Sequence, residues 1–491
     1  MASPDIGTEF DFGGVKERIV TRYDFSLDRA RQVLRGVKII TIGYGVQGPA
    51  QSLNLYDNGF DVIVGQRLGP TFEKAVADGW IPGQNLFTIE EALKQGEPGR
   101  RQIQYLLSDA GQKEMWPLIR QYLYTGDNLY FSHGFSYRYS HLTGVEPQSY
   151  VDVNMVAPKG AGRTLRVLVK EGKGVNSSFA VGQDYTGRAM ERTLATGMAI
   201  GSGFLFPTIF ENEVHSDLTG ERGVLLGAVW GLIQAAYENL RRQNYSPIDA
   251  VVHTNEVTTQ TISRIIGEKG ADGLIQDLPA DLLPDFGNGF IAAYEAVEPT
   301  FEELYERVVA GVETARVLEA NSKPDYRDTL NDELRQMREL PIGQAAAQVR
   351  ARRPQVLDSD VLPRIKDRRD AIMAGELVGI MHAQYDLFRN NGHLPSEAFN
   401  ETVEEATQSL YPMIDERGMD WMYANCSSTA QRGALDWNGR FKEVLEPALQ
   451  PVYEGKYQPA DKVRDIILGS EMWRAGEMVR QLRPENQRLA A

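Results

Sequence analysis

A glycine-rich turn between a predicted strand and a predicted helix is the feature that most constrains this fold. The strand VKIITI (37–42) runs directly into Gly43-Tyr44-Gly45-Val46-Gln47-Gly48, and the residues that follow have helical spacing. In this context the first glycine makes the turn, the second lets a pyrophosphate approach the backbone, and the third allows close helix packing. The free N–H groups of the helix would face the phosphates. The motif predicts a dinucleotide-binding domain of the Rossmann type.

The pattern of the chain changes at about residue 205. Before it, short β-rich runs alternate with helical stretches, which is typical of an α/β fold with a parallel sheet. After Gly203, long helical patterns follow one another, as in an all-α region. The predicted strands are VKIITI (37–42), DVIV (61–64), IQYLLS (103–108), NLYFS (128–132), VDVNMVA (151–157) and SSFAVG (177–182).

The helical part contains an internal repeat. GAVWGLIQAAYENLRR (227–242) matches GELVGIMHAQYDLFRN (375–390) at an offset of 148 residues, and Asn255-Glu256 recurs as Asn400-Glu401. This period is too long for a solenoid, so we expect a duplicated helical domain whose two copies are intertwined. The predicted domains are 1–205, 206–355 and 356–491.

Two pairs of carboxylates lie four residues apart on predicted helices, a spacing that places both side chains of a pair on one helix face. They are Asp217 with Glu221, and Glu401 with Glu405. Alone, either pair could be a solvated acidic face. In the repeat, however, each copy has only one complete pair.

The positions opposite these carboxylates are occupied by Ile365, Arg369, Glu256 and Gln260, the last two when the copies are aligned on the shared Asn-Glu. The complete pairs are therefore complementary, as expected if one composite site survives from two. Four carboxylates with no histidine or cysteine nearby in the sequence are suited to Mg²⁺.

The end of the second strand bears on the choice of cofactor. An acidic residue there binds the ribose 2′-OH of NAD, whereas an arginine accommodates the 2′-phosphate of NADP. Here the strand ends in Gln66-Arg67 with no acid, which favours NADP(H). The alternative is that Arg67 is a solvated loop charge.

Two further polar residues follow predicted strands, where ligands bind in open α/β sheets. His133 lies in FSHGF, and Lys159 lies among small residues in APKGAG (157–162). His133 could equally be a hydrogen-bonded structural histidine.

Charge and hydropathy exclude some classes of function. The formal net charge is −15, which argues against nucleic-acid and anionic-membrane partners. The longest apolar stretch, 223–233, is far shorter than the roughly 20 residues of a membrane span. Cys426 is the only cysteine, so no disulfide can form within the chain. We find no targeting segment and expect a cytoplasmic protein.

Together these segments closely resemble the ketol-acid reductoisomerase (acetohydroxy acid isomeroreductase) family in its long, plant-like form with a duplicated helical domain. The motifs that carry the resemblance are GYGVQGPAQ, SHGF, VAPKGAG, SDLTGERG, NETVEEA and NCSSTAQRGALDW, in family order. The resemblance implies Mg²⁺-dependent alkyl migration in 2-acetolactate or 2-aceto-2-hydroxybutyrate, followed by reduction by NADPH to a 2,3-dihydroxy acid. This chemistry belongs to the biosynthesis of valine, leucine and isoleucine.

The resemblance also implies roles for individual residues. Two Mg²⁺ ions would be held by Asp217, Glu221, Glu401 and Glu405, with Asp217 as the bridge. Ser427 would bind the substrate, and His133 and Lys159 would line the reaction site. The residues implied to hold the cofactor are Gly43, Tyr44, Gly45, Val46, Gln47, Gly48, Arg67, Thr71, Ser108, Asp109, Gln112 and Gly162.

The loop after Arg67 departs from the family pattern. Members that use NADPH usually carry serines there as further phosphate donors, whereas this chain has Pro70 and a single hydroxyl, Thr71. NADH is therefore a possible cofactor as well.

Two other classes of function stay open. An NADP-dependent hydroxyacid or sugar-acid dehydrogenase would not need the paired carboxylates, and a nucleotide-sensing scaffold would bind NADPH without turnover. We expect a small-molecule substrate and a homo-oligomer, with a dimer as the working hypothesis.

Overall fold

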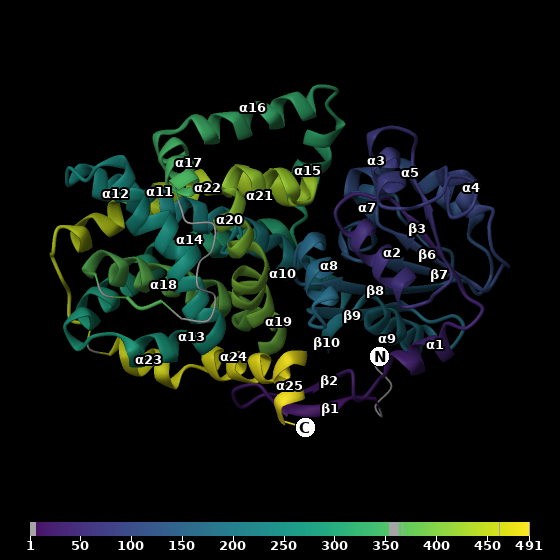
Figure 1. The fold of residues 1–491 in the computed structure, drawn as a ribbon, viewed down its shortest axis with the longest axis horizontal. Helices are drawn as coiled ribbons and strands as arrows, with labels where there is room; N and C mark the ends of the chain where they lie inside the picture. Colours follow the sequence, from purple (N-terminus) through teal and green to yellow (C-terminus); the bar gives the residue numbers. More distant parts are fainter. Residues whose placement is uncertain (1–5, 353–362, 366, 461, 491) are drawn as a thin grey trace. The chain divides into compact units, whose positions relative to one another are not determined.

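The computed structural model describes residues 6–352, 363–365, 367–460 and 462–490. The chain divides into two compact units (Figure 1). The sheet unit comprises Met1–Asp11, Lys16–His215 and Gln481–Ala491, and the helical unit comprises Phe12–Val15 and Ser216–Arg480. Each unit is described by itself.

The sheet unit is built on an eight-stranded sheet with the order β10-β9-β8-β7-β6-β3-β4-β5. Neighbouring strands are parallel except for the antiparallel pair β8 and β9. A separate antiparallel pair is formed by β1 and β2. The strands are β1 (Thr8–Asp11), β2 (Lys16–Ile19), β3 (Lys38–Ile42), β4 (Val62–Gly65), β5 (Leu86–Phe87), β6 (Arg101–Tyr105), β7 (Asn128–Phe131), β8 (Asp152–Pro158), β9 (Val175–Gln183) and β10 (Ser202–Pro207).

The six predicted strands are confirmed as β3, β4, β6, β7, β8 and β9. Their apolar residues are buried on both faces of the sheet. Ile39 of β3 packs in one core cluster, while its neighbour Ile40 packs in another on the opposite face. Because β3, β4, β6, β7 and β8 are parallel, their carboxyl ends meet at one edge of the sheet.

The helices of the sheet unit connect these strands and cover the two core clusters. They are α1 (Leu27–Val33), α2 (Gln47–Asp57), α3 (Pro70–Ala77), α4 (Ile89–Leu93), α5 (Asp109–Ile119), η1 (Arg120–Tyr122), α6 (Phe135–Arg138), α7 (Ser140–Thr143), α8 (Gly162–Lys170), α9 (Ala189–Ile200) and α25 (Pro484–Ala490). The boundary between the units falls within α10 (Phe210–Arg222).

The described part of the helical unit contains no strand. Its helices are α11 (Gly227–Arg242), α12 (Pro247–Val251), η2 (Val252–Ile262), α13 (Ser263–Asp277), η3 (Ala280–Leu282), α14 (Leu283–Val309), α15 (Val312–Ser322), α16 (Tyr326–Glu339), α17 (Pro341–Arg352), α18 (Arg368–Asn390), α19 (Pro395–Phe399), η4 (Asn400–Glu404), η5 (Ala406–Leu410), α20 (Tyr411–Arg417), α21 (Met419–Asn425), α22 (Ser428–Tyr453), α23 (Val463–Gly469) and α24 (Glu471–Leu482).

The two copies of the repeat are intertwined, as predicted. Helix α11 of the first copy packs on α22 of the second, and α18 of the second packs on α14 of the first. Glycines permit this close approach: a Cβ on Gly231 would lie 2.6 Å from the carbonyl oxygen of Asn438, and one on Gly379 would lie 2.5 Å from that of Phe290. Both residues of one contact are related to those of the other by the 148-residue offset.

The structure corrects the alignment of the repeat around the second carboxylate pair. Helices α12 and α19 begin at Pro247 and Pro395, and the π-helical segments η2 and η4 begin at Val252 and Asn400, so the offset remains 148 residues. The alignment on the shared Asn-Glu, which used an offset of 145, was wrong. The residues opposite Glu401 and Glu405 are His253 and Val257, not Glu256 and Gln260.

The predicted domain boundaries stay predictions. Strand β10 extends to Pro207, two residues past the boundary at 205, and the sheet unit continues to His215. The boundary at 355 lies outside the described residues.

The packed interior of the helical unit contains a carboxyl group that carries a stability prediction. Glu376 on α18 is fully buried and accepts a hydrogen bond from the hydroxyl of Tyr453 at 3.3 Å. Burial raises the pKa of Glu376 from 4.5 to about 8. The folded protein therefore retains a proton that the unfolded chain releases between these pH values, so rising pH favours unfolding.

We expect Glu376→Gln to remove this pH dependence. Each unit by which the pKa is raised corresponds to about 1.4 kcal/mol. Between pH 5 and pH 9, the free energy of unfolding of the variant should therefore rise by at least about that much relative to that of the wild type. Thermal unfolding at a series of pH values measures the difference, with the exposed Glu302→Gln on α14 as the control. Parallel melting curves for the wild type and the Gln variant would contradict the prediction.

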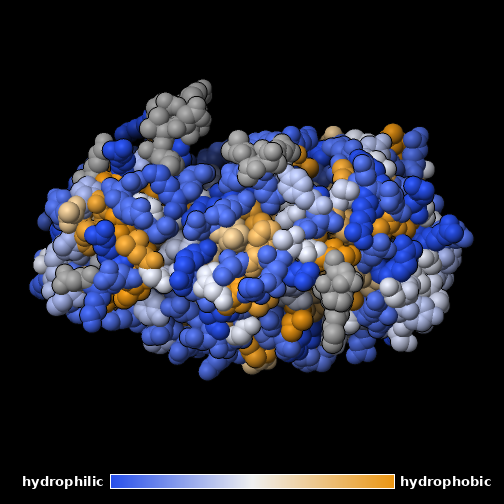
Figure 2. All heavy atoms as spheres, turned by 90° about the horizontal axis from the view of Figure 1, so that it is seen from below, coloured by the Kyte–Doolittle hydropathy of each residue, from blue (hydrophilic) through white to orange (hydrophobic). Residues whose placement is uncertain are grey.

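No helix in the described part of the chain is long and apolar enough to cross a membrane. On the face shown in Figure 2, hydrophobic residues form separate groups among hydrophilic ones. Scattered exposed apolar residues of this kind are normal for protein surfaces.

Candidate functional site

His133 and Lys159 lie together at the carboxyl edge of the sheet, because β7 and β8 are parallel neighbours and each residue follows one of them. Glu213 of α10 joins the two. Its carboxylate lies 3.1 Å from Nδ1 of His133 and 3.3 Å from Nζ of Lys159, and it accepts a hydrogen bond from the N–H of Gly134 at 2.7 Å. The expected proximity of His133 and Lys159 is therefore present in the sheet unit.

Glu213 is a buried ion whose charge is stabilised by its neighbours. Burial alone would raise its pKa, but the positive charges of His133 and Lys159, with hydrogen bonds from His133 and Gly134, lower the pKa to about 2. The side chain of Lys159 is only 1% exposed, so this carboxylate is the counter-ion of a buried ammonium group.

Sequence reasoning missed Glu213, although a signal was present. Glu213, Asp217 and Glu221 follow one another at intervals of four residues, which places all three on one face of α10. The first of them faces His133 and Lys159 in the sheet unit. The other two are the predicted metal ligands in the helical unit.

Helix α10 and the π-helical segment η4 bring residues of the two copies into contact. The hydroxyl of Ser216 lies 3.5 Å from a carboxylate oxygen of Glu401, and a Cβ on Gly220 would lie 3.0 Å from the carbonyl oxygen of Glu401. Glu401 is fully buried. The predicted ligands Asp217 and Glu221 occupy this same segment of α10.

The second members of the two pairs, Glu221 and Glu405, both lie near enough to one thiol for their charges to act on it. The pKa of Cys426 is raised by burial and further by the negative charges of Glu221 and Glu405. The next residue, Ser427, is the N-cap of α22 and accepts a hydrogen bond from the N–H of Ala430 at 2.9 Å. The structure thus brings the two predicted carboxylate pairs and Ser427 together within the helical unit.

This arrangement fits a hard divalent cation. The four carboxylates offer only oxygen atoms, the donors that Mg²⁺ prefers. Like charges gathered in a largely buried region repel one another unless a cation compensates them. Asp217, Glu221, Glu401 and Glu405 could therefore hold Mg²⁺.

At the pseudo-symmetric position in the helical unit, carboxylates are paired with basic side chains instead. There Arg369 replaces Glu221 and forms hydrogen bonds with Asp367, one of them 2.6 Å long, while Nδ1 of His253, which replaces Glu401, lies 2.6 Å from Asp370. Hydrogen bonds from Arg369 lower the pKa of Asp367 to about 2, despite the opposing effect of burial. Among the described residues, the counterpart of the carboxylate cluster therefore consists of Asp367 and Asp370 with Arg369 and His253 as their partners.

The glycine-rich turn has the geometry that its sequence predicts. Gly43 has a φ of +103°, and a Cβ there would lie 2.8 Å from the carbonyl oxygen of Leu106. A Cβ on Gly48 would lie 2.2 Å from the carbonyl oxygen of Gly43, whereas nothing lies within 4 Å of one on Gly45. Helix α2 begins at Gln47 without a side-chain cap. The turn therefore offers open backbone and free N–H groups to a phosphate.

The loop before α8 closes on this turn. A Cβ on Gly162 would lie 2.1 Å from the carbonyl oxygen of Val46. The side-chain amide of Gln47 donates a hydrogen bond to the carbonyl oxygen of Gly160 at 3.1 Å. Gly162 thus lies beside the turn, as expected for a residue near the cofactor.

Several other predicted cofactor residues have structural contacts. The hydroxyl of Tyr44 donates to Asp78 at 2.9 Å and accepts from the indole N–H of Trp80 at 3.0 Å. Ser108 caps α5, where Asp109 is buried in the first turn, and the side-chain amide of Gln112 donates to the carbonyl oxygens of Tyr105 and Leu107.

Thr71 and Arg67 lie beyond the end of β4. Thr71 is in the first turn of α3, and Arg67 forms an ion pair with Glu114 of α5. That ion pair was not predicted from the sequence.

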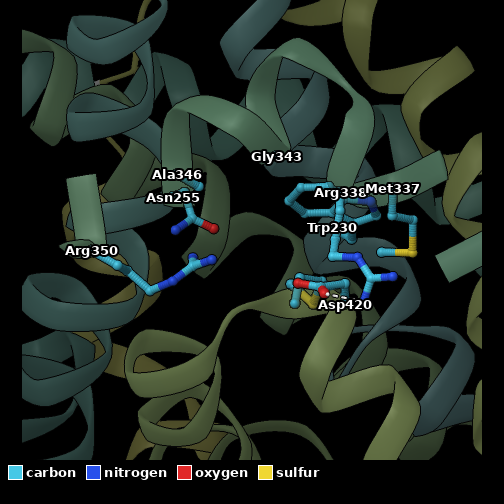
Figure 3. Close-up of a pocket in the computed structure, with 9 residues that line it drawn as sticks. Trp230, Asn255, Met337, Arg338, Gly343, Ala346, Arg350 and Asp420 are labelled. Atoms are coloured by element: carbon cyan, nitrogen blue, oxygen red, sulfur yellow. Dashed lines mark hydrogen bonds and ion pairs between the residues drawn. The ribbon is translucent and has the colours of Figure 1, made fainter. Parts of the chain in front are cut away.

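A small pocket in the helical unit lies apart from the predicted site residues, none of which lines it (Figure 3). Arg338 and Asp420 face each other there with an N–O distance of 3.5 Å. Its lining residues are Trp230, Asn255, Met337, Arg338, Gly343, Ala346, Arg350, Met419 and Asp420.

Comparisons with known proteins cover most of the chain. Residues 33–204 match the family model of the acetohydroxy acid isomeroreductase NADPH-binding domain, and residues 210–355 and 370–485 match that of the ketol-acid reductoisomerase C-terminal domain.

Individual relatives agree with these matches. The chain is 50% identical over 353 residues (70% of this chain, 97% of the relative) to "Ketol-acid reductoisomerase (NAD(+))" of Desulfosudis oleivorans. It is 33% identical to the chloroplastic enzyme of Spinacia oleracea, over 92% of this chain and 76% of the relative. The solved structure of an NADH-preferring ketol-acid reductoisomerase from an uncultured archean superposes with a TM-score of 0.60 at 27% identity, covering 69% of this chain and all of that one. The fold, the geometry of the glycine-rich turn and these matches together show that the chain belongs to the ketol-acid reductoisomerase family.

Proposed function

We propose that this family member converts 2-acetolactate or 2-aceto-2-hydroxybutyrate to the corresponding 2,3-dihydroxy acid, with Mg²⁺ and a nicotinamide dinucleotide. The observation that supports this most strongly is the pairing of α10 with η4, which assembles complementary carboxylate pairs from the two copies of the repeat. A dehydrogenase that only transfers hydride would have no need of such a cluster.

In this proposal the four carboxylates hold two Mg²⁺ ions, which, when bound, lower the pKa of the substrate hydroxyl and polarise its ketone. Ser427 orients the substrate: its oxygen accepts the capping hydrogen bond from Ala430, so its O–H can donate to a substrate oxygen. Alkyl migration needs both groups held in one geometry.

His133, Lys159 and Glu213 form the second part of the proposed machinery. The shared carboxylate fixes the orientation of the imidazole ring and of the ammonium group. A buried ammonium paired with a carboxylate can hold or transfer a proton while the site excludes water. We therefore assign His133 and Lys159 to the reaction site and Glu213 to positioning them.

The glycine-rich turn binds the cofactor in this proposal. Gly45 leaves room for the pyrophosphate, and the N-terminus of α2 faces it. Relatives of this chain carry both NAD(+) and NADP(+) in their names, so either nicotinamide could be the natural reductant.

The test is oxidation of NADPH and of NADH with 2-acetolactate as substrate, with Mg²⁺ and after its removal by EDTA. We expect turnover only with Mg²⁺ present and recovery when it is restored. Turnover that does not depend on a divalent cation would contradict the proposal.

We further expect each chain to hold a whole active site, because α10 and η4 of one chain are in contact. Co-expression of an Asp217→Asn chain with a Glu405→Gln chain should therefore give an inactive mixture. Recovery toward about a quarter of wild-type activity, the share expected for random pairing across a two-fold interface, would show that sites form between chains. A dimeric state and a cytoplasmic location remain predictions.

A further inference from the structure

The carboxylate of Glu114 forms an ion pair with Arg67, the residue expected to bind the 2′-phosphate of the cofactor. Nη1 of Arg67 lies 3.1 Å and 3.2 Å from the two carboxylate oxygens of Glu114. Arg67 follows β4, and Glu114 lies on α5, which follows β6. Strands β4 and β6 are the two neighbours of β3, the strand that runs into the glycine-rich turn. The ion pair therefore joins the two loops that flank the turn at the carboxyl edge of the sheet.

The charge balance at this position is unfavourable for a 2′-phosphate. Among residues 66–71, Arg67 is the only charged side chain, and Glu114 cancels its charge. The charge of Glu114 also affects Tyr105 of β6. The pKa of this tyrosine is raised by burial and, to a smaller extent, by the negative charge of Glu114. A phosphate monoester carries nearly two negative charges at neutral pH and would meet both an engaged guanidinium and a like charge.

The 2′-hydroxyl of NADH would meet the same residues favourably. It is neutral and can donate a hydrogen bond to a carboxylate, which is the role of the acid that ends the second strand in NAD-binding Rossmann domains. That acid is absent after Gly65, where Gln66 instead accepts a hydrogen bond from the N–H of Tyr44 at 3.0 Å.

We propose that Glu114 determines cofactor specificity by supplying from α5 the carboxylate that is absent from the end of β4, so that NADH is favoured over NADPH. The inference rests on the proposed function, because it concerns the cofactor of that reaction. It assigns to Arg67 a second role: the guanidinium holds Glu114 in place and does not await a phosphate.

Removing the charge of Glu114 should not disturb folding. The two side chains are 54% and 61% exposed, and ion pairs this exposed contribute little to stability. The effect of these two charges on the affinity for a charged ligand is not limited by their small contribution to stability. The ligand brings a charge of its own, with which both side chains interact.

The experiment measures dissociation constants and KM values for NADPH and NADH in wild type and Glu114→Gln. We expect the variant to bind NADPH about tenfold more tightly, as relief of one nearby like charge predicts, and to bind NADH more weakly, because the acceptor for its 2′-hydroxyl is lost. The gain for NADPH should vanish when Arg67→Ala is added to Glu114→Gln, because the released guanidinium would then be missing.

Glu97→Gln is the matched control. Glu97 is 72% exposed and pairs with Arg100 just before β6 begins, at the amino edge of the sheet. Loss of its charge should therefore leave the affinities for NADPH and NADH unchanged. An equal change for both nucleotides, or none, in Glu114→Gln would overturn the specificity proposal even if 2-acetolactate is turned over. Absence of Mg²⁺-dependent turnover in wild type with either nucleotide would overturn the proposed function and, with it, this inference.

Discussion

Replacing Glu405 with glutamine should abolish turnover of 2-acetolactate while NADH and NADPH still bind. The charges of Glu405 and Glu221 both act on Cys426, and the substitution removes the charge of one proposed ligand while preserving the shape of the side chain. We expect kcat to fall at least about a hundredfold, more than the loss typical of residues that only support a metal ligand. Isothermal titration with Mg²⁺ should show weakened binding in parallel, and cofactor fluorescence should be unchanged.

Glu256→Gln is the control for this substitution. Glu256 is a buried glutamate on η2, the π-helical segment of the other copy, and its carboxylate accepts hydrogen bonds from Asn255 and Gln260. That copy carries His253 and Val257 at the positions of the proposed ligands. The kcat of the Glu256→Gln variant should therefore stay within about twofold of wild type. If Glu405→Gln retains more than about a tenth of wild-type kcat, an effect of about 1.4 kcal/mol, Glu405 is not a metal ligand.

The sequence was informative where a local rule dictates the structure. Gly43 has a positive φ and a Cβ on Gly48 would meet the carbonyl oxygen of Gly43, so much of the turn's geometry could be predicted from its six residues. The apolar runs of β3 and β4 were equally clear, because strands buried on both faces are commonly continuously hydrophobic. Strand β10 was missed: it begins with Ser202-Gly203, which has no strand signal, at the point where the helical pattern starts.

The repeat led to the correct carboxylates by an alignment that was partly wrong. The pairing of Asn255-Glu256 with Asn400-Glu401 was a coincidence of two letters, whereas the true offset of 148 matches Thr254 with Thr402 and Gln260 with Gln408. The starts of η2 and η4, at Val252 and Asn400, keep the offset at 148. The conclusion survived because His253 and Val257 also fail to provide a second carboxylate pair.

Contacts between distant segments could not be predicted. Glu114 and Arg67 are 47 residues apart, and Glu213 and His133 are 80 apart, so no local pattern connects either pair. Both depend on the order of strands in the sheet, which a single sequence does not provide. The charge partners of Arg67 and Lys159 became apparent only in the folded chain.

Glu213→Gln should impair both stability and turnover. The substitution leaves the ammonium group of Lys159, which is 1% exposed, next to a neutral amide. Removing one partner of a buried ion pair costs about 3–5 kcal/mol of stability. Because the pKa of Glu213 is lowered from 4.5 to about 2, its contribution is present above pH 4.5 and is lost as the pH falls toward 2. The difference in melting temperature between wild type and variant should therefore be present at pH 6 and shrink in acid.

Two further variants separate the structural from the positioning role of Glu213. Glu211→Gln alters a carboxylate two residues earlier on α10, where it pairs with the partly exposed Arg138, and should lower stability by no more than about 1 kcal/mol. Adding Lys159→Met to Glu213→Gln removes the unpaired charge, so it should restore much of the stability without restoring turnover. If the double variant regains both, Glu213 serves only to neutralise Lys159; if Glu213→Gln alone keeps wild-type kcat at a temperature where it is folded, the carboxylate does not position His133 and Lys159 for the reaction.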